Sequence, residues 1–145
     1  MRTYPCEEMK RFNYLTGEIN AVYHAIARRV GLPDSEMQIL YTIVDNGNVC
    51  TQSRIVRLTG LCKQTLNSAL RRMEAQELIV TEAAGMRGRN VRLTENGMRL
   101  AEQTAVKVME AERAAFDGWS VQEVETYLAL TEKFLTAFGE KARLL

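Results

Sequence analysis

A change in the spacing of apolar residues after position 76 constrains the fold of this 145-residue chain more than any other feature. Up to that point, apolar residues recur at three- and four-residue steps, which is the pattern of amphipathic helices. Two short runs of strand-forming residues, 78–81 and 90–93, then enclose a tip that contains Gly85 and Gly88. The order predicts a series of helices followed by a two-stranded hairpin.

Capping and breaking residues divide the remaining chain into six helices. Asp34 or Ser35 can cap the second, Thr51 the third, Thr94 the fifth and Ser120 the sixth, because their side-chain oxygens can accept from free backbone N–H groups. We predict helices over residues 7–30, 34–44, 51–58, 63–76, 94–116 and 120–139. The predicted buried faces of the second and third helices are Met37, Leu40, Tyr41 and Val44, and Ile55, Val56 and Leu58.

Two short helices separated by a three-residue break, and then a hairpin, follow the order of a winged helix-turn-helix. The expected fold is therefore mainly α-helical with a small β wing, in a single domain of residues 1–145. In such a fold the helix over 63–76 has the width needed to enter the major groove of DNA. The hairpin would lie alongside it.

The charge pattern supports a polyanion as partner. Residues 51–100 contain nine Lys and Arg against four Asp and Glu, a net charge of +5, whereas the whole chain has a net charge of +1. Gln64 and Asn67 can pair with an adenine edge, and an arginine at the hairpin tip can enter the minor groove. The predicted DNA-binding residues are Ser53, Arg54, Lys63, Gln64, Thr65, Asn67, Ser68, Arg71, Arg72, Arg87 and Arg89.

The stretch CTQSRIVRLTGLCKQTLNSALRRMEAQELIV (50–80) resembles the MarR family, the multiple antibiotic resistance regulators. GLPDSEMQIL (31–40) before it and the Leu-Thr-x-x-Gly motif (93–97) after the hairpin extend the resemblance. Arg87 matches the wing arginine of that family. Three positions depart from its usual pattern: Gly85 replaces an Asp at the wing tip, Cys62 a Ser, and Glu77 a Gly.

The resemblance implies a homodimer that binds a pseudo-palindromic operator in double-stranded DNA. Helices 7–30 and 94–139 would form the dimer interface, and residues 34–93 the DNA-binding lobe. Repression is the outcome that the family favours. Release would come from a small aromatic or phenolic effector, or from oxidation of a cysteine.

Two sets of residues are candidates for sensing. Cys6 lies near Lys10 and Arg11, which favour a thiolate, but beside two glutamates that oppose it, and Cys62 begins a helix next to a lysine. An effector pocket is one interpretation of a group of residues on the first two helices, and ordinary core and interface packing is the other. That group is Tyr14, Tyr23, His24, Met37 and Tyr41.

Other functions find less support in the sequence. Three cysteines without a Cys-x-x-Cys pair, and a single histidine, argue against a metal site, and no cofactor motif is present. The chain has no nucleophile elbow or phosphate-binding glycine loop, so an enzyme is not expected. With no signal peptide or membrane-spanning run, we expect a cytoplasmic protein. The alternative function is a winged-helix module that binds protein rather than DNA.

Overall fold

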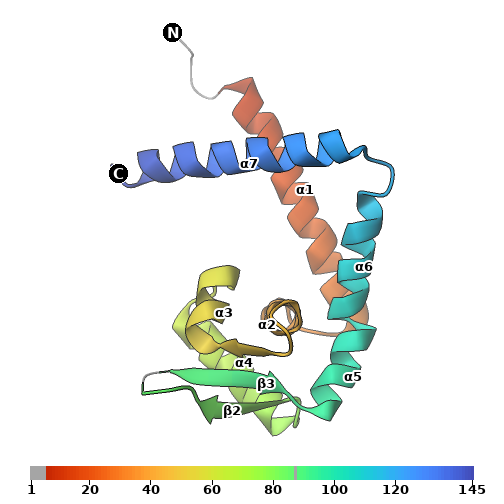
Figure 1. Ribbon diagram of the computed structural model, residues 1–145, viewed down its shortest axis with the longest axis vertical. Helices are drawn as coiled ribbons and strands as arrows, with labels where there is room; N and C mark the ends of the chain where they lie inside the picture. Colours follow the sequence, from red (N-terminus) through yellow and green to blue (C-terminus); the bar gives the residue numbers. More distant parts are fainter. Residues whose placement is uncertain (1–5, 87) are drawn as a thin grey trace. The chain divides into compact units, whose positions relative to one another are not determined.

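The computed structural model describes residues 6–86 and 88–145, which form the predicted mainly helical fold with a small antiparallel sheet (Figure 1). The chain divides into two compact units, which meet in the sequence at Val108 and Met109. The elements, in chain order, are α1 (Glu7–Val30), α2 (Asp34–Asp45), β1 (Val49–Thr51), α3 (Gln52–Thr59), α4 (Lys63–Ala75), β2 (Ile79–Ala83), β3 (Arg89–Leu93), α5 (Glu95–Gln103), α6 (Ala105–Ala115) and α7 (Val121–Ala142).

Helix α2 is the centre of the first unit. It contacts α1, α3, α4, α5, β1 and β3, which surround it when the molecule is viewed along its axis (Figure 1). Ile39, Leu40 and Ile43 are fully buried, whereas Tyr41 and Val44 are only partly covered. The predicted buried face of this helix was therefore incomplete. A helix that is packed on most sides also buries residues that the pattern of a helix with one buried face predicts to be exposed.

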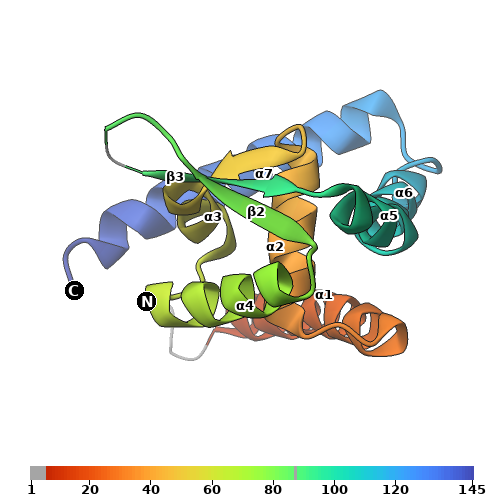
Figure 2. The same cartoon turned by 90° about the horizontal axis from the view of Figure 1, so that it is seen from below.

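The sheet has three strands in the order β1-β3-β2, and both pairs are antiparallel. Strands β2 and β3 are the predicted hairpin, which Figure 2 shows extending beyond α2 and α3. Strand β1 was not predicted, since its three residues become a strand only by pairing with β3, with Cys50 opposite Val91. This pairing attaches the base of the wing to the segment between α2 and α3.

The Leu-Thr-x-x-Gly motif joins the end of the wing to the end of α4. The Thr94 hydroxyl caps α5 by accepting from the Gly97 N–H at 3.0 Å, and it donates to the Glu77 carbonyl at 2.6 Å. The Thr94 N–H donates to the Leu78 carbonyl at 3.0 Å. Two hydrogen bonds from one threonine therefore hold the end of the wing against the segment after α4, and a third starts α5.

Two predicted features of the helices were wrong. The fifth predicted helix is divided at Thr104, which is buried and whose hydroxyl donates to the Leu100 carbonyl at 2.7 Å, a type of bond that bends helices. Neither Asp34 nor Ser35 caps α2: Pro33 occupies that position, and the Asp34 carboxylate is hydrogen-bonded to His24 at 2.6 Å. The caps at Thr51, Thr94 and Ser120 are confirmed.

One predicted core residue of the third helix was also wrong. Ile55 is fully buried and Val56 is partly buried, but the Leu58 residue is 53% exposed. Because α3 is only two turns long, the sequence offered few positions from which to choose its buried face.

Glu77 occupies the left-handed region of backbone space, with φ at 59°. That conformation costs an L-residue about 1 kcal/mol relative to glycine. We therefore expect Glu77→Gly to raise the free energy of unfolding by up to about 1 kcal/mol, less the extra chain entropy of glycine in the unfolded state. Urea denaturation would measure the change. The control is Glu77→Ala, which removes the side chain but keeps the strained β-carbon; an equal gain in both variants would contradict the backbone explanation.

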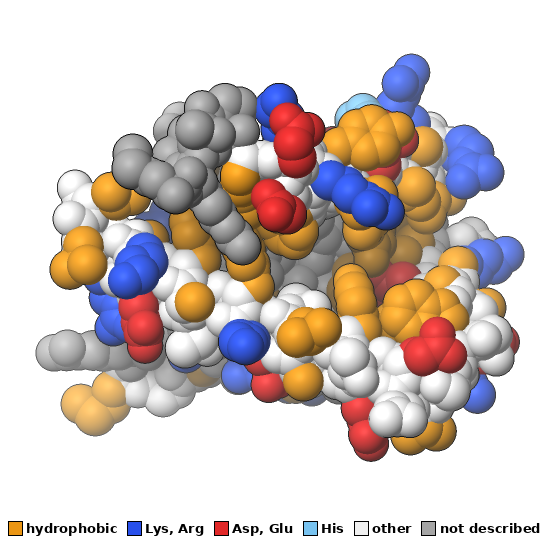
Figure 3. Space-filling view, turned by 90° about the horizontal axis from the view of Figure 1, so that it is seen from above, with side chains coloured by type: hydrophobic (Ala, Val, Ile, Leu, Met, Phe, Trp, Pro, Cys, Tyr) orange, Lys and Arg blue, Asp and Glu red, His pale blue; other side chains and the backbone are white. Residues whose placement is uncertain are grey.

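Both long helices at the ends of the chain present apolar side chains to the surface. Only Ala27 is buried on α1, and α7 contains no buried residue. Figure 3 shows one face of the molecule, on which hydrophobic side chains are exposed among charged ones. The exposed apolar residues include Phe12, Leu15, Ile19 and Val22 of α1, and Leu128, Phe134, Leu135 and Phe138 of α7. Within the described ranges, no helix has the length and apolar character needed to cross a bilayer.

Candidate nucleic-acid interface

Helix α4 has one buried and one exposed face, as predicted. Leu66, Ala69, Leu70 and Met73 pack into the core. All the predicted DNA-binding side chains of this helix are exposed. Residues four and three apart lie on the same face of a helix, so Gln64, Ser68 and Arg71 form its outermost row. An amide, a hydroxyl and a guanidinium in one row can contact base edges and phosphates.

Arg72 differs from its neighbour Arg71 because it has a partner inside the protein. Its Nε lies 3.1 Å from Oε1 of Glu36, and the Glu36 side chain is only 5% exposed, whereas that of Arg72 is 50% exposed. A buried carboxylate needs a compensating charge. The sequence indicated only that Glu36 suits the start of α2, because its partner lies 36 positions away.

The start of α3 carries Ser53 and Arg54, both exposed. Thr51 caps this helix by accepting from the Arg54 N–H at 3.2 Å, and its hydroxyl lies 3.3 Å from that of Ser53. The Arg54 side chain turns toward the end of α2, where its Nε donates to Oδ1 of Asn46 at 2.7 Å. Asn46 was not identified from the sequence, in which it reads as part of a turn.

The wing contributes further basic groups. Arg89 is exposed at the start of β3, opposite Ala83, and Arg87 lies outside the described residues. Arg92 forms a cross-strand ion pair with Glu82 at 3.2 Å, which offsets its charge. Lys63 is exposed at the first position of α4.

The three cysteines have different surroundings. Cys62 is exposed at the N-cap of α4, and its Sγ lies 3.1 Å from the Thr65 hydroxyl. Hydrogen bonds from the side chain and backbone of Thr65 lower the pKa of the Cys62 thiol, whereas burial raises the pKa of the Cys50 thiol. Cys6 is half-buried just before α1. Cys62, one of the two predicted sensors, therefore has surroundings that favour a thiolate.

The predicted effector-pocket residues have contrasting surroundings. Met37 belongs to the core and Tyr41 packs partly against it, whereas Tyr14 is 66% exposed and Tyr23 is also exposed. His24 is hydrogen-bonded to Asp34.

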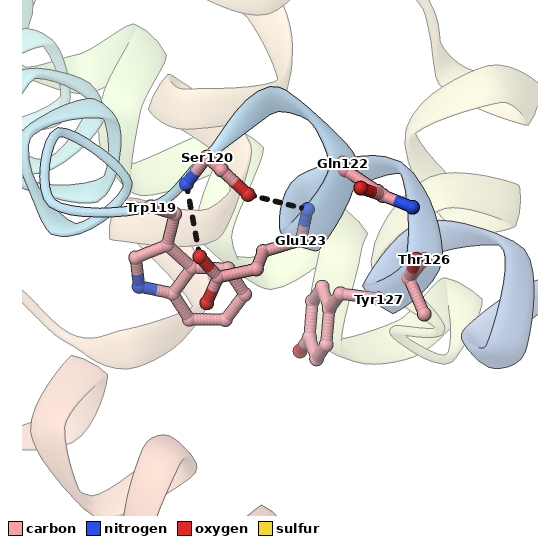
Figure 4. A pocket seen from close by; sticks show the side chains of 6 residues that line it. All are labelled: Trp119, Ser120, Gln122, Glu123, Thr126 and Tyr127. Atoms are coloured by element: carbon pink, nitrogen blue, oxygen red, sulfur yellow. Dashed lines mark hydrogen bonds between the residues drawn. The ribbon is translucent and has the colours of Figure 1, made fainter.

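A shallow hollow lies elsewhere, at the start of α7, and Figure 4 shows its lining. Trp119 and Tyr127 meet there edge to face, with their ring centroids 5.5 Å apart. Ser120 and Glu123 form a capping box, in which the Glu123 carboxylate accepts from the Ser120 N–H at 3.2 Å. The carboxylate of this hollow is thus already used to start the helix.

Comparison with known protein families gives a match over the winged-helix region. Residues 30–89 match the model of the MarR family. Among curated proteins no match was found.

Solved structures extend the likeness to nearly the whole chain. A MarR-family transcriptional regulator from Silicibacter pomeroyi is 23% identical over 90% of this chain and 89% of its own, with a TM-score of 0.71. NadR in complex with 4-hydroxyphenylacetate is 15% identical over 92% and 96%, with a TM-score of 0.73. BpsR of Bordetella bronchiseptica, whose DNA binding is regulated by 6-hydroxynicotinic acid, is 19% identical over 86% and 98%, with a TM-score of 0.60. These likenesses establish the fold.

Proposed function

We propose that this chain, whose residues 30–89 match the model of the MarR family, is a sequence-specific, DNA-binding transcription regulator of that family that acts as a repressor. One observation carries the proposal. The outermost row of α4 consists of Gln64, Ser68 and Arg71, and it is exposed on the helix that follows the break after α3. These side chains can read base edges, and the basic residues of α3 and the wing can hold the backbone.

The proposal includes a homodimer. Helix α7 has 22 residues and buries none of its apolar side chains, so another protein surface must pack against it in solution. Helix α1 presents a second apolar row, from Phe12 to Val22. A second copy of the chain supplies matching apolar faces, and a two-fold arrangement would set two α4 helices about one turn of DNA apart.

The proposal also includes release by a small molecule or by oxidation. NadR forms a complex with 4-hydroxyphenylacetate, and 6-hydroxynicotinic acid regulates the DNA binding of BpsR. Both compounds are small hydroxylated aromatic acids. This supports an aromatic or phenolic effector for the present chain. Oxidation has its own support in the thiol of Cys62, which stands at the start of the proposed recognition helix.

The decisive experiment is selection of bound sequences from a pool of random duplexes. We expect an enriched sequence with two-fold symmetry, and binding that weakens steeply between about 50 and about 200 mM salt. Asn67→Ala should broaden the selected sequence more than it lowers affinity for random DNA. Failure of the unmodified protein to bind any duplex at about 50 mM salt would exclude the proposal and leave the protein-binding module.

Cys62 provides a second test. Because the pKa of Cys62 is lowered and that of Cys50 is raised, we expect iodoacetamide to modify Cys62 before Cys50. The difference in rate between these two thiols should be greatest at a pH below the ordinary range of thiol titration. Mass spectrometry would locate the label. If peroxide releases DNA through this thiol, a Cys62→Ser variant should stay bound after treatment. Release that is equal in both proteins would remove Cys62 from the proposal.

A further inference from the structure

Two arginines of the helix-turn-helix are held by α2, one at each end of that helix. Arg54 donates from Nε to Asn46, the C-cap residue of α2, and Arg72 donates from Nε to Glu36 in its first turn. In each case the bond uses the inner nitrogen of the guanidinium. Within residues 6–86 and 88–145, the terminal nitrogens of Arg54 have no hydrogen-bond partner.

The two anchors differ in charge. Glu36 is ionisable and buried, so its pair with Arg72 has little net charge to offer a phosphate. Asn46 is neutral, so Arg54 keeps its whole positive charge while its orientation is set. A guanidinium held through Nε presents its two terminal nitrogens together, which is the geometry that binds a phosphate through two hydrogen bonds.

The Asn46 amide is itself held in place. Its Nδ2 donates to the Thr42 carbonyl at 2.7 Å, so the opposite atom, Oδ1, must face Arg54. Arg54 lies in the first turn of α3, directly after β1, and β1 pairs with the wing strand β3. Thr51, the N-cap residue of α3, pairs with Asn90 of β3, so the helix turn that carries Arg54 begins beside the wing.

We propose that Asn46 is a positioning residue that presets the Arg54 guanidinium to grip a phosphate of duplex DNA. The inference rests on the proposed DNA-binding function and adds a residue that touches no DNA itself. Presetting matters because ordering a long side chain at the moment of binding lowers affinity, and an arginine ordered beforehand has already met that cost.

Two substitutions of Asn46 separate orientation from charge. Asn46→Ala frees Arg54 but leaves its charge, so affinity for a random-sequence duplex should fall about three- to tenfold with an unchanged salt slope. Asn46→Asp loses the bond to the Thr42 carbonyl but keeps an acceptor for Nε, and its carboxylate offsets the positive charge of Arg54. The slope of log affinity against log salt should then shrink by about one for each subunit bound, as it should in Arg54→Ala.

Fluorescence anisotropy at several salt concentrations would measure all four proteins, and thermal unfolding by circular dichroism would establish the temperature at which each is folded. If the unmodified protein binds DNA but Asn46→Ala binds equally well, the positioning role is excluded. An undiminished slope in Asn46→Asp would also overturn it. Absence of binding by the unmodified protein would instead exclude the proposed function, and this inference with it.

Discussion

Replacing Gly97 with alanine is expected to lower the free energy of unfolding by about 3 kcal/mol, the upper range for forcing an extra group into a packed interior. A β-carbon at this position would collide with the Leu78 carbonyl oxygen and would stand 3.3 Å from a methyl group of Leu93. The carbonyl cannot withdraw easily, because it accepts a hydrogen bond from the Thr94 N–H. The end of α4, the wing and α5 would have to move apart. Urea denaturation would measure the loss.

Gly17 provides the matched control for this substitution. It also lies within a helix, but a β-carbon there would meet no atom within 4 Å. Gly17→Ala should therefore stabilise the protein by about 0.5 to 1 kcal/mol, the ordinary gain from replacing a glycine within a helix. A Gly97→Ala protein as stable as the original would show that the contact with Leu78 relaxes at little cost. The glycine of the Leu-Thr-x-x-Gly motif would then need another explanation.

The helix boundaries could be predicted from the sequence because their signals are local. Thr51, Thr94 and Ser120 each cap the residues that follow them, and Gly31 ends α1 with a positive φ of 74°. Such signals depend on a few neighbouring residues, so a pattern in the sequence is sufficient to find them. The hairpin was found for the same reason, from the glycines at its tip.

The features that sequence reasoning missed depend on distant partners. Strand β1 exists only because β3 pairs with it, and Ile43 is fully buried because other elements surround α2. The break at Thr104 has no proline or glycine to mark it, and the bond from the Thr104 hydroxyl to the Leu100 carbonyl is one that Thr42 and Thr131 also form within unbroken helices.

The candidate interface likewise combines features that could be predicted from the sequence with features that depend on distant partners. Periodicity could identify which side chains of α4 face outward, but not which of two adjacent arginines has a partner. Arg71 and Arg72 are both exposed arginines, and only the fold brings Glu36 next to Arg72. Asn46 likewise gained its importance from a contact with α3.

Arg72→Ala and Arg71→Ala are therefore expected to differ in their effects on stability. Arg72→Ala leaves the buried carboxylate of Glu36 without its partner, and should lower the free energy of unfolding by about 2 kcal/mol. This value is below the usual cost of breaking a buried pair, because half of the Arg72 side chain faces solvent. Arg71 has no ion-pair partner among the residues that the structure describes, so its loss should leave stability almost unchanged. Thermal and urea unfolding would measure both.

The effects on DNA binding should follow the reverse order, with Arg71→Ala changing the salt slope more than Arg72→Ala. Arg71→Ala removes a free charge from the outermost row of α4, so the salt slope should fall by about one per subunit. Arg72→Ala should keep the slope at temperatures where the protein is folded, since its charge is already offset by Glu36.

A double variant tests the cause of the instability. Replacing Glu36 with glutamine in the Arg72→Ala protein removes the unpaired charge while keeping the shape of the side chain. If the buried charge is the cause, the double variant should be more stable than Arg72→Ala alone, because two residues in contact have effects that do not add. Additive losses would instead mean that Arg72 stabilises the protein through packing of the aliphatic part of its side chain.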